Sequence, residues 1–157
     1  LLLSTGLTAR KIAVVNETVK FDIGGESKEV FHADPDGAGV FLDPSGSGDY
    51  AYVSNSESFT DGGVGAIRFT STGQVIGYQS LRFRDPKNGT LSIRRTRRNC
   101  GGGKTYWGTW LTCEEWSRGQ VWEVDPWGKT PGRMTRMGGL GRAYESAAYD
   151  SRDRKNP

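Results

Sequence analysis

The residues whose types and spacing could do chemistry lie in one segment, between positions 99 and 115. Cys100 precedes three consecutive glycines, which would let the backbone approach a ligand closely. A thiolate at Cys100 could bind a metal ion. Glu114 and Glu115 end a Trp- and Leu-rich run that is typical of a strand, and carboxylates there could supply hard oxygen ligands for calcium or iron. The alternative for this segment is a glycine-rich hairpin that buries a free cysteine.

Three other motifs carry weaker signals. Residues 101–105 end in Gly-Lys-Thr but lack the first glycine of a phosphate-binding loop, because Asn99 holds that position, so we reject a nucleotide-binding loop. Residues 34–37 are similar to part of a calcium loop, without the glutamate at the spacing of an EF-hand. His32 has no second histidine to share a ligand or a proton with, so we expect it in a loop or packing role.

A basic run at residues 93–98 precedes the Cys100 segment. It could attract anionic phosphate substrates or nucleic acid, and a plain solvated face is the simplest alternative. The formal charge of +3 and the pI near 9.0 are a mild excess that does not indicate a dedicated nucleic-acid binder. Arg98, with the adjacent Asn99, is our candidate for binding a substrate phosphate.

The elements that must position these residues are short strands. The 157 residues suffice for one domain, and 23 glycines with 11% aromatic residues favour strands joined by tight turns. No stretch has the apolar period of a helix, so we predict an all-β fold with almost no helix. We expect one or two strands within residues 11–23, a loop at 32–39, and strands at 40–42, 50–55, 64–69 and 75–78.

An internal repeat suggests how the strands assemble. Residues 52–57 line up with 110–115, and residues 65–73 line up with 119–128, at offsets of 58 and 54. Repeats of about 40–50 residues made of short strands are typical of propeller blades. We therefore predict a single incomplete β-propeller domain over residues 1–157, with about two to three blades of short antiparallel strands. Two meanders of one sandwich that look alike by chance are the alternative.

The blade-like units are expected at about residues 30–80 and 99–130, with a third opening near 144. Propellers typically close with about four to eight blades, so this chain alone should not close a ring. Its open edge could pair with missing blades or with a second copy. The absence of an initial Met and the turn-like last residues predict a piece of a longer protein without a complete signal peptide. No apolar run approaches the roughly 20 residues that span a bilayer.

The Cys100 segment resembles a known family. Asn99, Cys100 and the glycines 101–103, followed by residues 107–115, are similar to the signature of the PhoX-type alkaline phosphatases. Residues 121–126 fit that family's next strand, and the resemblance extends over about residues 30–150. It implies a β-propeller of about six blades. It also implies an extracellular or periplasmic phosphomonoesterase that uses iron and calcium.

The resemblance implies roles for individual residues. Cys100 would be the thiolate ligand to iron. The pair Glu114 and Glu115 would supply one metal carboxylate, with Glu115 preferred because it aligns with Glu57 in the internal repeat. Glu145 matches a position of the family where a glutamate binds metal. Glu57, with Asn55, resembles an earlier Asn-x-Glu element that could line the same channel, so it is a further candidate ligand. The chain departs from the family where histidines often precede these two glutamates, and the later blades that complete the metal cluster are absent.

Two functions from different classes follow. The first is a metal-dependent hydrolase of phosphomonoesters, inactive as this piece if the missing blades carry essential ligands. The alternative is a non-catalytic propeller module that binds a protein or a metal. Binding of nucleic acid by the basic run is a third and weaker reading.

Overall fold

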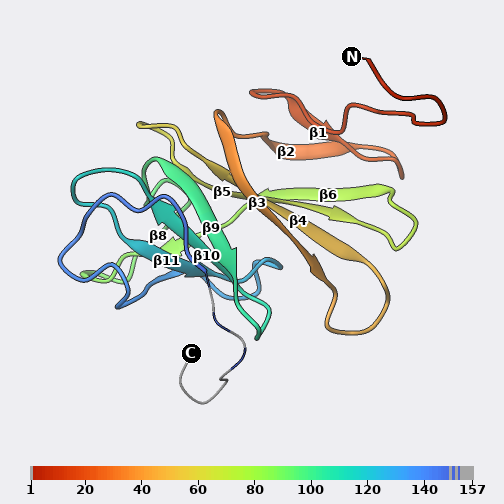
Figure 1. The fold of residues 1–157 in the computed structure, drawn as a ribbon. Coiled ribbons are helices and arrows are strands. Elements are labelled where there is room, and N and C mark those ends of the chain that lie inside the picture. Colours follow the sequence, from red (N-terminus) through yellow and green to blue (C-terminus); the bar gives the residue numbers. More distant parts are fainter. Residues whose placement is uncertain (1, 149, 151, 153–157) are drawn as a thin grey trace.

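A computed structural model describes residues 2–148, 150 and 152 of the chain (Figure 1). These residues form twelve short strands and no helix, which confirms the predicted all-β fold. Eight of the strands make two four-stranded antiparallel sheets. None of the described residues forms an apolar helix long enough to span a bilayer.

The first sheet is an up-and-down meander whose strands follow chain order. Its strands are β3 (Pro35–Leu42), β4 (Tyr50–Ser56), β5 (Gly63–Phe69) and β6 (Val75–Ser80). Tight turns connect them, and Gly46 and Gly73 adopt the positive φ that these turns require. The sequence predicted β4, β5 and β6 at nearly these positions.

The second sheet repeats the same topology further along the chain. Its strands are β9 (Asn99–Lys104), β10 (Trp110–Glu114), β11 (Val121–Val124) and β12 (Arg133–Met134). Two hairpins accompany the sheets, made of β1 (Thr18–Lys20) with β2 (Glu26–Val30) and of β7 (Phe83–Arg84) with β8 (Leu91–Ser92). Residues 144–148 form no strand, and Tyr149 of the expected third unit lies outside the described residues.

The two sheets meet through β3 and β9, which lie side by side (Figure 1). Between the sheets lies the main hydrophobic cluster, in which Trp110 packs edge-on against Phe41 and Trp122 packs edge-on against Phe83. Successive four-stranded meanders that pack in this way have a propeller-like arrangement. This arrangement is consistent with the predicted partial propeller.

One expected loop is a strand. Residues 32–39 were predicted as a loop, but β3 begins at Pro35 and pairs with β4 from Ala38 to Leu42. A bulge between Pro35 and Ala38 interrupts the pairing. Because β3 is an edge strand of its sheet, it can accommodate a proline that donates no hydrogen bond. Within residues 11–23, only Thr18–Lys20 form a strand.

Candidate functional site

Three potential metal ligands converge where the two sheets meet. Asp36 lies on β3, Glu57 directly follows β4, and Cys100 lies on β9. One ligand atom from each residue lies within 4.8 Å of the other two. The Cys100 Sγ lies 3.6 Å from Asp36 Oδ2. Two hard carboxylates and a softer thiolate form a donor set that suits a transition metal such as iron.

Hydrogen bonds from Asn55 connect the strands that carry this cluster. Its buried side-chain amide donates to the carbonyl oxygens of Cys100 (2.7 Å) and Gly101 (2.8 Å). Its own carbonyl accepts a hydrogen bond from Trp110 Nε1 at 2.9 Å. The end of β4 is thus fixed against β9, which sets the position of Glu57 relative to Cys100.

Gly37 permits the close approach of β3 to β9. A Cβ at this position would lie 2.6 Å from the Cα of Gly101 and 2.8 Å from the carbonyl oxygen of Cys100. Any larger residue would therefore separate the two strands. The close packing brings Asp36, the neighbour of Gly37, beside the Cys100 thiol.

The electrostatics of the cluster favour a bound cation. Burial raises the pKa of the Glu57 carboxyl, and the nearby acids Glu115 and Asp36 raise it further, while Arg98 opposes the shift. Burial and the charge of Asp36 raise the pKa of the Cys100 thiol to about 11. A metal ion would stabilise the ionised form of each of these groups. The residues present thus fit a metal site.

Arg98 is held at the edge of this cluster. Its Nη2 lies 3.2 Å from Glu57 Oε1 and 3.6 Å from Glu115 Oε2. Its backbone nitrogen donates to Ser58, and its carbonyl oxygen accepts from the backbone nitrogen of Glu115. Arg98 therefore joins the loops after β4 and β10, and its partly exposed guanidinium lies beside the potential metal ligands.

The two adjacent glutamates have different surroundings. Glu115 shares Arg98 with Glu57. The buried Glu114 carboxylate instead accepts hydrogen bonds from the backbone nitrogens of Arg97 and Gln120 and from Trp122 Nε1. Glu114 is the last residue of β10 and Glu115 directly follows it, so the two carboxylates have separate partners. Of the predicted pair, the structure brings Glu115 towards the cluster.

The other two predicted residues, Asn99 and Glu145, have their backbones near the cluster, but their side chains lie outside it. The Asn99 side chain is buried, donating to Thr112 Oγ1 and accepting from Thr96 Oγ1. The Glu145 side chain is exposed, while its carbonyl oxygen lies so near Gly101 that a Cβ there would collide with it. Gly101 and Gly103 therefore make room for the backbone of residues 145–147.

Sequence reasoning missed Asp36. The only signal was the partial calcium-loop pattern at residues 34–37, which we set aside because it lacked the EF-hand glutamate. His32 has the packing role expected for it, with Nε2 at 3.1 Å from Ser54 Oγ and Nδ1 at 3.3 Å from Tyr78 OH. Burial lowers its pKa to about 4.

Both cysteines are free thiols. Cys113 is buried against Leu111 and Val121, and burial raises its pKa to about 11. It is therefore a packing residue of β10, in contrast to the partly exposed Cys100.

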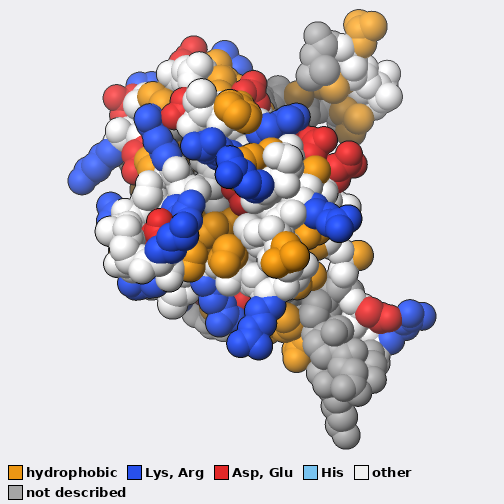
Figure 2. Space-filling model, turned by 90° about the vertical axis from the view of Figure 1, so that its left-hand side faces the viewer, with side chains coloured by type: hydrophobic (Ala, Val, Ile, Leu, Met, Phe, Trp, Pro, Cys, Tyr) orange, Lys and Arg blue, Asp and Glu red, His pale blue; other side chains and the backbone are white. Residues whose placement is uncertain are grey.

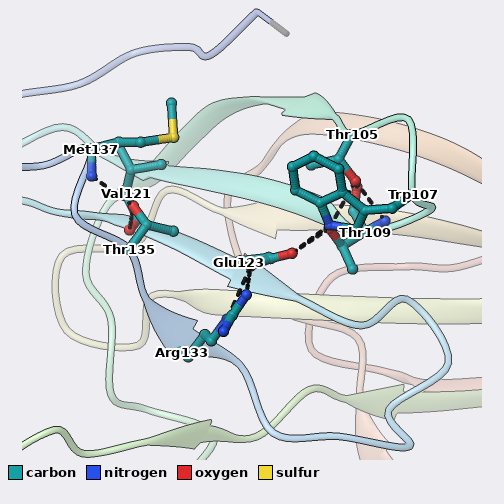
Figure 3. A network of polar contacts seen from close by, with 8 residues as sticks. All are labelled: Thr105, Trp107, Thr109, Val121, Glu123, Arg133, Thr135 and Met137. Atoms are coloured by element: carbon teal, nitrogen blue, oxygen red, sulfur yellow. Dashed lines mark hydrogen bonds and ion pairs between the residues drawn. The ribbon is translucent and has the colours of Figure 1, made fainter. Parts of the chain in front are cut away.

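A separate carboxylate network lies on the second sheet (Figure 3). The buried Glu123 of β11 accepts hydrogen bonds from Trp107 Nε1 (2.6 Å) and Thr109 Oγ1 (2.8 Å). Arg133 of β12 pairs with its other oxygen at 2.8 Å. Burial opposes ionisation of Glu123, but the hydrogen bonds from these three residues outweigh it and lower its pKa. This carboxylate has its partners within the chain.

Comparison with known proteins identifies the family. A search of curated proteins and one of solved structures gave no match. The family model described as alkaline phosphatase PhoX matches residues 47–156, which is most of the chain and includes Glu57, Arg98 and Cys100. The chain therefore belongs to the PhoX alkaline phosphatase family.

Proposed function

We propose that this chain carries part of the metal centre of a phosphomonoesterase, with Asp36, Glu57 and Cys100 as metal ligands. The convergence of these three side chains from three strands carries the proposal. Iron and calcium are the metals we propose, because the set combines a thiolate with carboxylates. When bound, such a metal would stabilise the negative charge that develops on a phosphoryl group.

Arg98 is the residue we propose for binding the substrate phosphate. A guanidinium presents paired N–H donors that match two phosphate oxygens. Its contacts with Glu57 and Glu115 hold it beside the metal ligands. Asn99 supports this role by fixing the start of β9 through its buried hydrogen bonds with Thr96 and Thr112.

Glu115 and Glu145 are further candidate ligands. Glu115 directly follows β10 and shares Arg98 with Glu57, and the backbone of Glu145 passes over Gly101, next to Cys100. We assign Glu114 a structural role, because three donors already occupy its carboxylate oxygens. In this proposal each four-stranded sheet is one propeller blade, and the protein is extracellular or periplasmic.

Hydrolysis of p-nitrophenyl phosphate tests this function. We expect the purified chain to hydrolyse it when iron and calcium are supplied and to stop when a chelator removes them. Cys100→Ala should abolish hydrolysis, and Arg98→Gln should raise KM more than it lowers kcat. The matched control is Cys113→Ala, which removes a thiol outside the cluster and should keep the activity. Hydrolysis that persists in Cys100→Ala, or that needs no metal, would contradict the proposal.

A further inference from the structure

We propose that a pocket next to the metal cluster binds a small oxyanion such as inorganic phosphate. The pocket has a volume of about 370 Å³, and its lining includes Arg95, Arg97, Arg118, Trp116 and Trp122. Lys and Arg side chains predominate over acidic ones on the side of the molecule shown in Figure 2. This inference goes beyond the proposed function, because none of the three metal ligands lines the pocket.

Aromatic rings hold the three guanidinium groups in place. Arg97 and Arg118 lie over the ring of Trp116, at 5.6 Å and 5.3 Å from its centroid. Arg95 lies over the ring of Trp122 at 5.5 Å. An arginine stacked on a ring keeps its N–H groups free to donate in the guanidinium plane. The rings thus order the donors before a ligand arrives, which lowers the entropic cost of binding.

The positive charge of this pocket is only partly compensated. Arg97 and Arg118 form no ion pair with any described residue, whereas Arg95 pairs with Asp85. Within the described chain, Glu114 is the acidic residue of the lining, and its oxygens are occupied by three donors. The excess of cationic side chains favours an anion.

A buried donor also lacks an acceptor. Trp116 Nε1 is buried and has no hydrogen-bond partner in the described part of the chain, and the same holds for the acceptor Gln120 Oε1 of the same lining. Phosphate offers several acceptor oxygens and negative charge, which matches a lining rich in donors. These properties identify the ligand class as a small oxyanion.

The pocket and the metal cluster lie on opposite sides of the same two chain segments. Arg98 and Glu115 lie on the side of the cluster, whereas their neighbours Arg97 and Glu114 line the pocket. Binding in the pocket should therefore require no metal. A phosphate that binds there would also remain when Arg98 is removed.

The test is a calorimetric titration of the chelator-treated chain with inorganic phosphate. Arg118→Gln should weaken binding about tenfold or more, because it removes charge-assisted hydrogen bonds from an exposed side chain. The matched control is Arg82→Gln, which makes the same charge change at an exposed arginine outside this pocket and should leave the affinity unchanged. Arg98→Gln should also bind as the wild type does. Unfolding curves of each variant would confirm that the fold is intact.

Three outcomes would overturn the proposal. The first is that the chelator-treated wild type binds no phosphate. The second is equal weakening by Arg82→Gln and Arg118→Gln, which would show that only net charge matters. The third is loss of binding in Arg98→Gln with Arg118→Gln unaffected, which would place the phosphate at the metal centre. That last result would leave the proposed phosphatase function standing, so the two proposals fail separately.

Discussion

Glu57 and Glu123 show how two carboxylates in one fold acquire opposite properties. Glu123 accepts hydrogen bonds from Trp107 and Thr109 of the loop between β9 and β10 and from Arg133 of β12, and these lower its pKa (Figure 3). Glu57 lies at the junction of the two sheets, next to Asp36 and Glu115, and its pKa is raised. Burial is the largest cause of that shift, the two acids add to it, and Arg98 offsets part of it.

This difference in surroundings distinguishes carboxylates that stabilise the fold from carboxylates that could bind a cation. A carboxylate whose partners are all supplied by the chain stabilises the fold without any ligand. A carboxylate that lies partly buried beside other acids and a thiol is stabilised by a cation. Glu114 belongs with Glu123 by this criterion, and Asp36 and Cys100 belong with Glu57. Three predictions test the distinction, the largest expected effect first.

Replacing Glu114 should destabilise the fold most. Glu114→Ala leaves three donors without their acceptor, each costing about 1–3 kcal/mol when buried. We expect the free energy of unfolding to fall by about 4 kcal/mol, measured by urea denaturation. The control is Glu115→Ala, which should cost less than about 1 kcal/mol because its ion pair is solvent-exposed. Equal losses in the two variants would contradict the assignment of Glu114 as structural.

Glu123 should make the protein more stable above pH 4.5 than below it. Its pKa is lower in the fold than the ordinary value of 4.5, so the folded state binds fewer protons than the unfolded state does. The stability that Glu123 confers is present above pH 4.5 and is lost as the pH falls through the pKa of Glu123 in the folded state. At pH 7, Glu123→Gln should cost about 2 kcal/mol, since a neutral amide cannot replace an ion pair with Arg133.

Unfolding curves at several pH values measure this dependence. The difference between the wild type and Glu123→Gln should shrink as the pH is lowered from 7 to 3. A difference that stays constant over this range would show that the charge of Glu123 does not stabilise the fold.

The pH dependence of stability at Glu57 should be opposite to that at Glu123, and its effect should be the smallest of the three. Its raised pKa means that the folded state binds the proton more tightly, so stability is lost as pH rises through the folded pKa. In chelator-treated protein, Glu57→Gln should therefore be more stable than the wild type at pH 8, by less than about 1 kcal/mol. Thermal unfolding at pH 5 and pH 8 would detect this. A variant less stable than the wild type at pH 8 would contradict the repulsion in the cluster.

Much of the fold was predictable because local signals agreed. Alternating apolar residues and glycine-containing turns located β4, β5 and β6. The alignment of residues 52–57 with 110–115 was informative, since β4 and β10 hold the same second place in two sheets of identical order. The Cys100 motif likewise identified the family.

The beginning of β3 was not predictable from local signals. Its proline and glycine are typical of turns, and only pairing with β4 makes the segment a strand. Because this segment was predicted as a loop, Asp36 was not recognised as a candidate ligand. Its contact with Cys100 spans 64 residues and depends on the missing Cβ of Gly37. The separation of Glu114 from Glu115 also required the structure, because sequence shows two adjacent acids but not which face holds the donors.

The central claim, that Cys100 belongs to a metal site, is tested most directly by elemental analysis. Iron and calcium would be measured in the purified wild-type chain, in Cys100→Ala and in the control Cys113→Ala. We predict bound iron in the wild type and in Cys113→Ala, and its loss in Cys100→Ala. Equal iron in all three proteins, or no bound metal in the wild type, would contradict the assignment of Asp36, Glu57 and Cys100 as metal ligands.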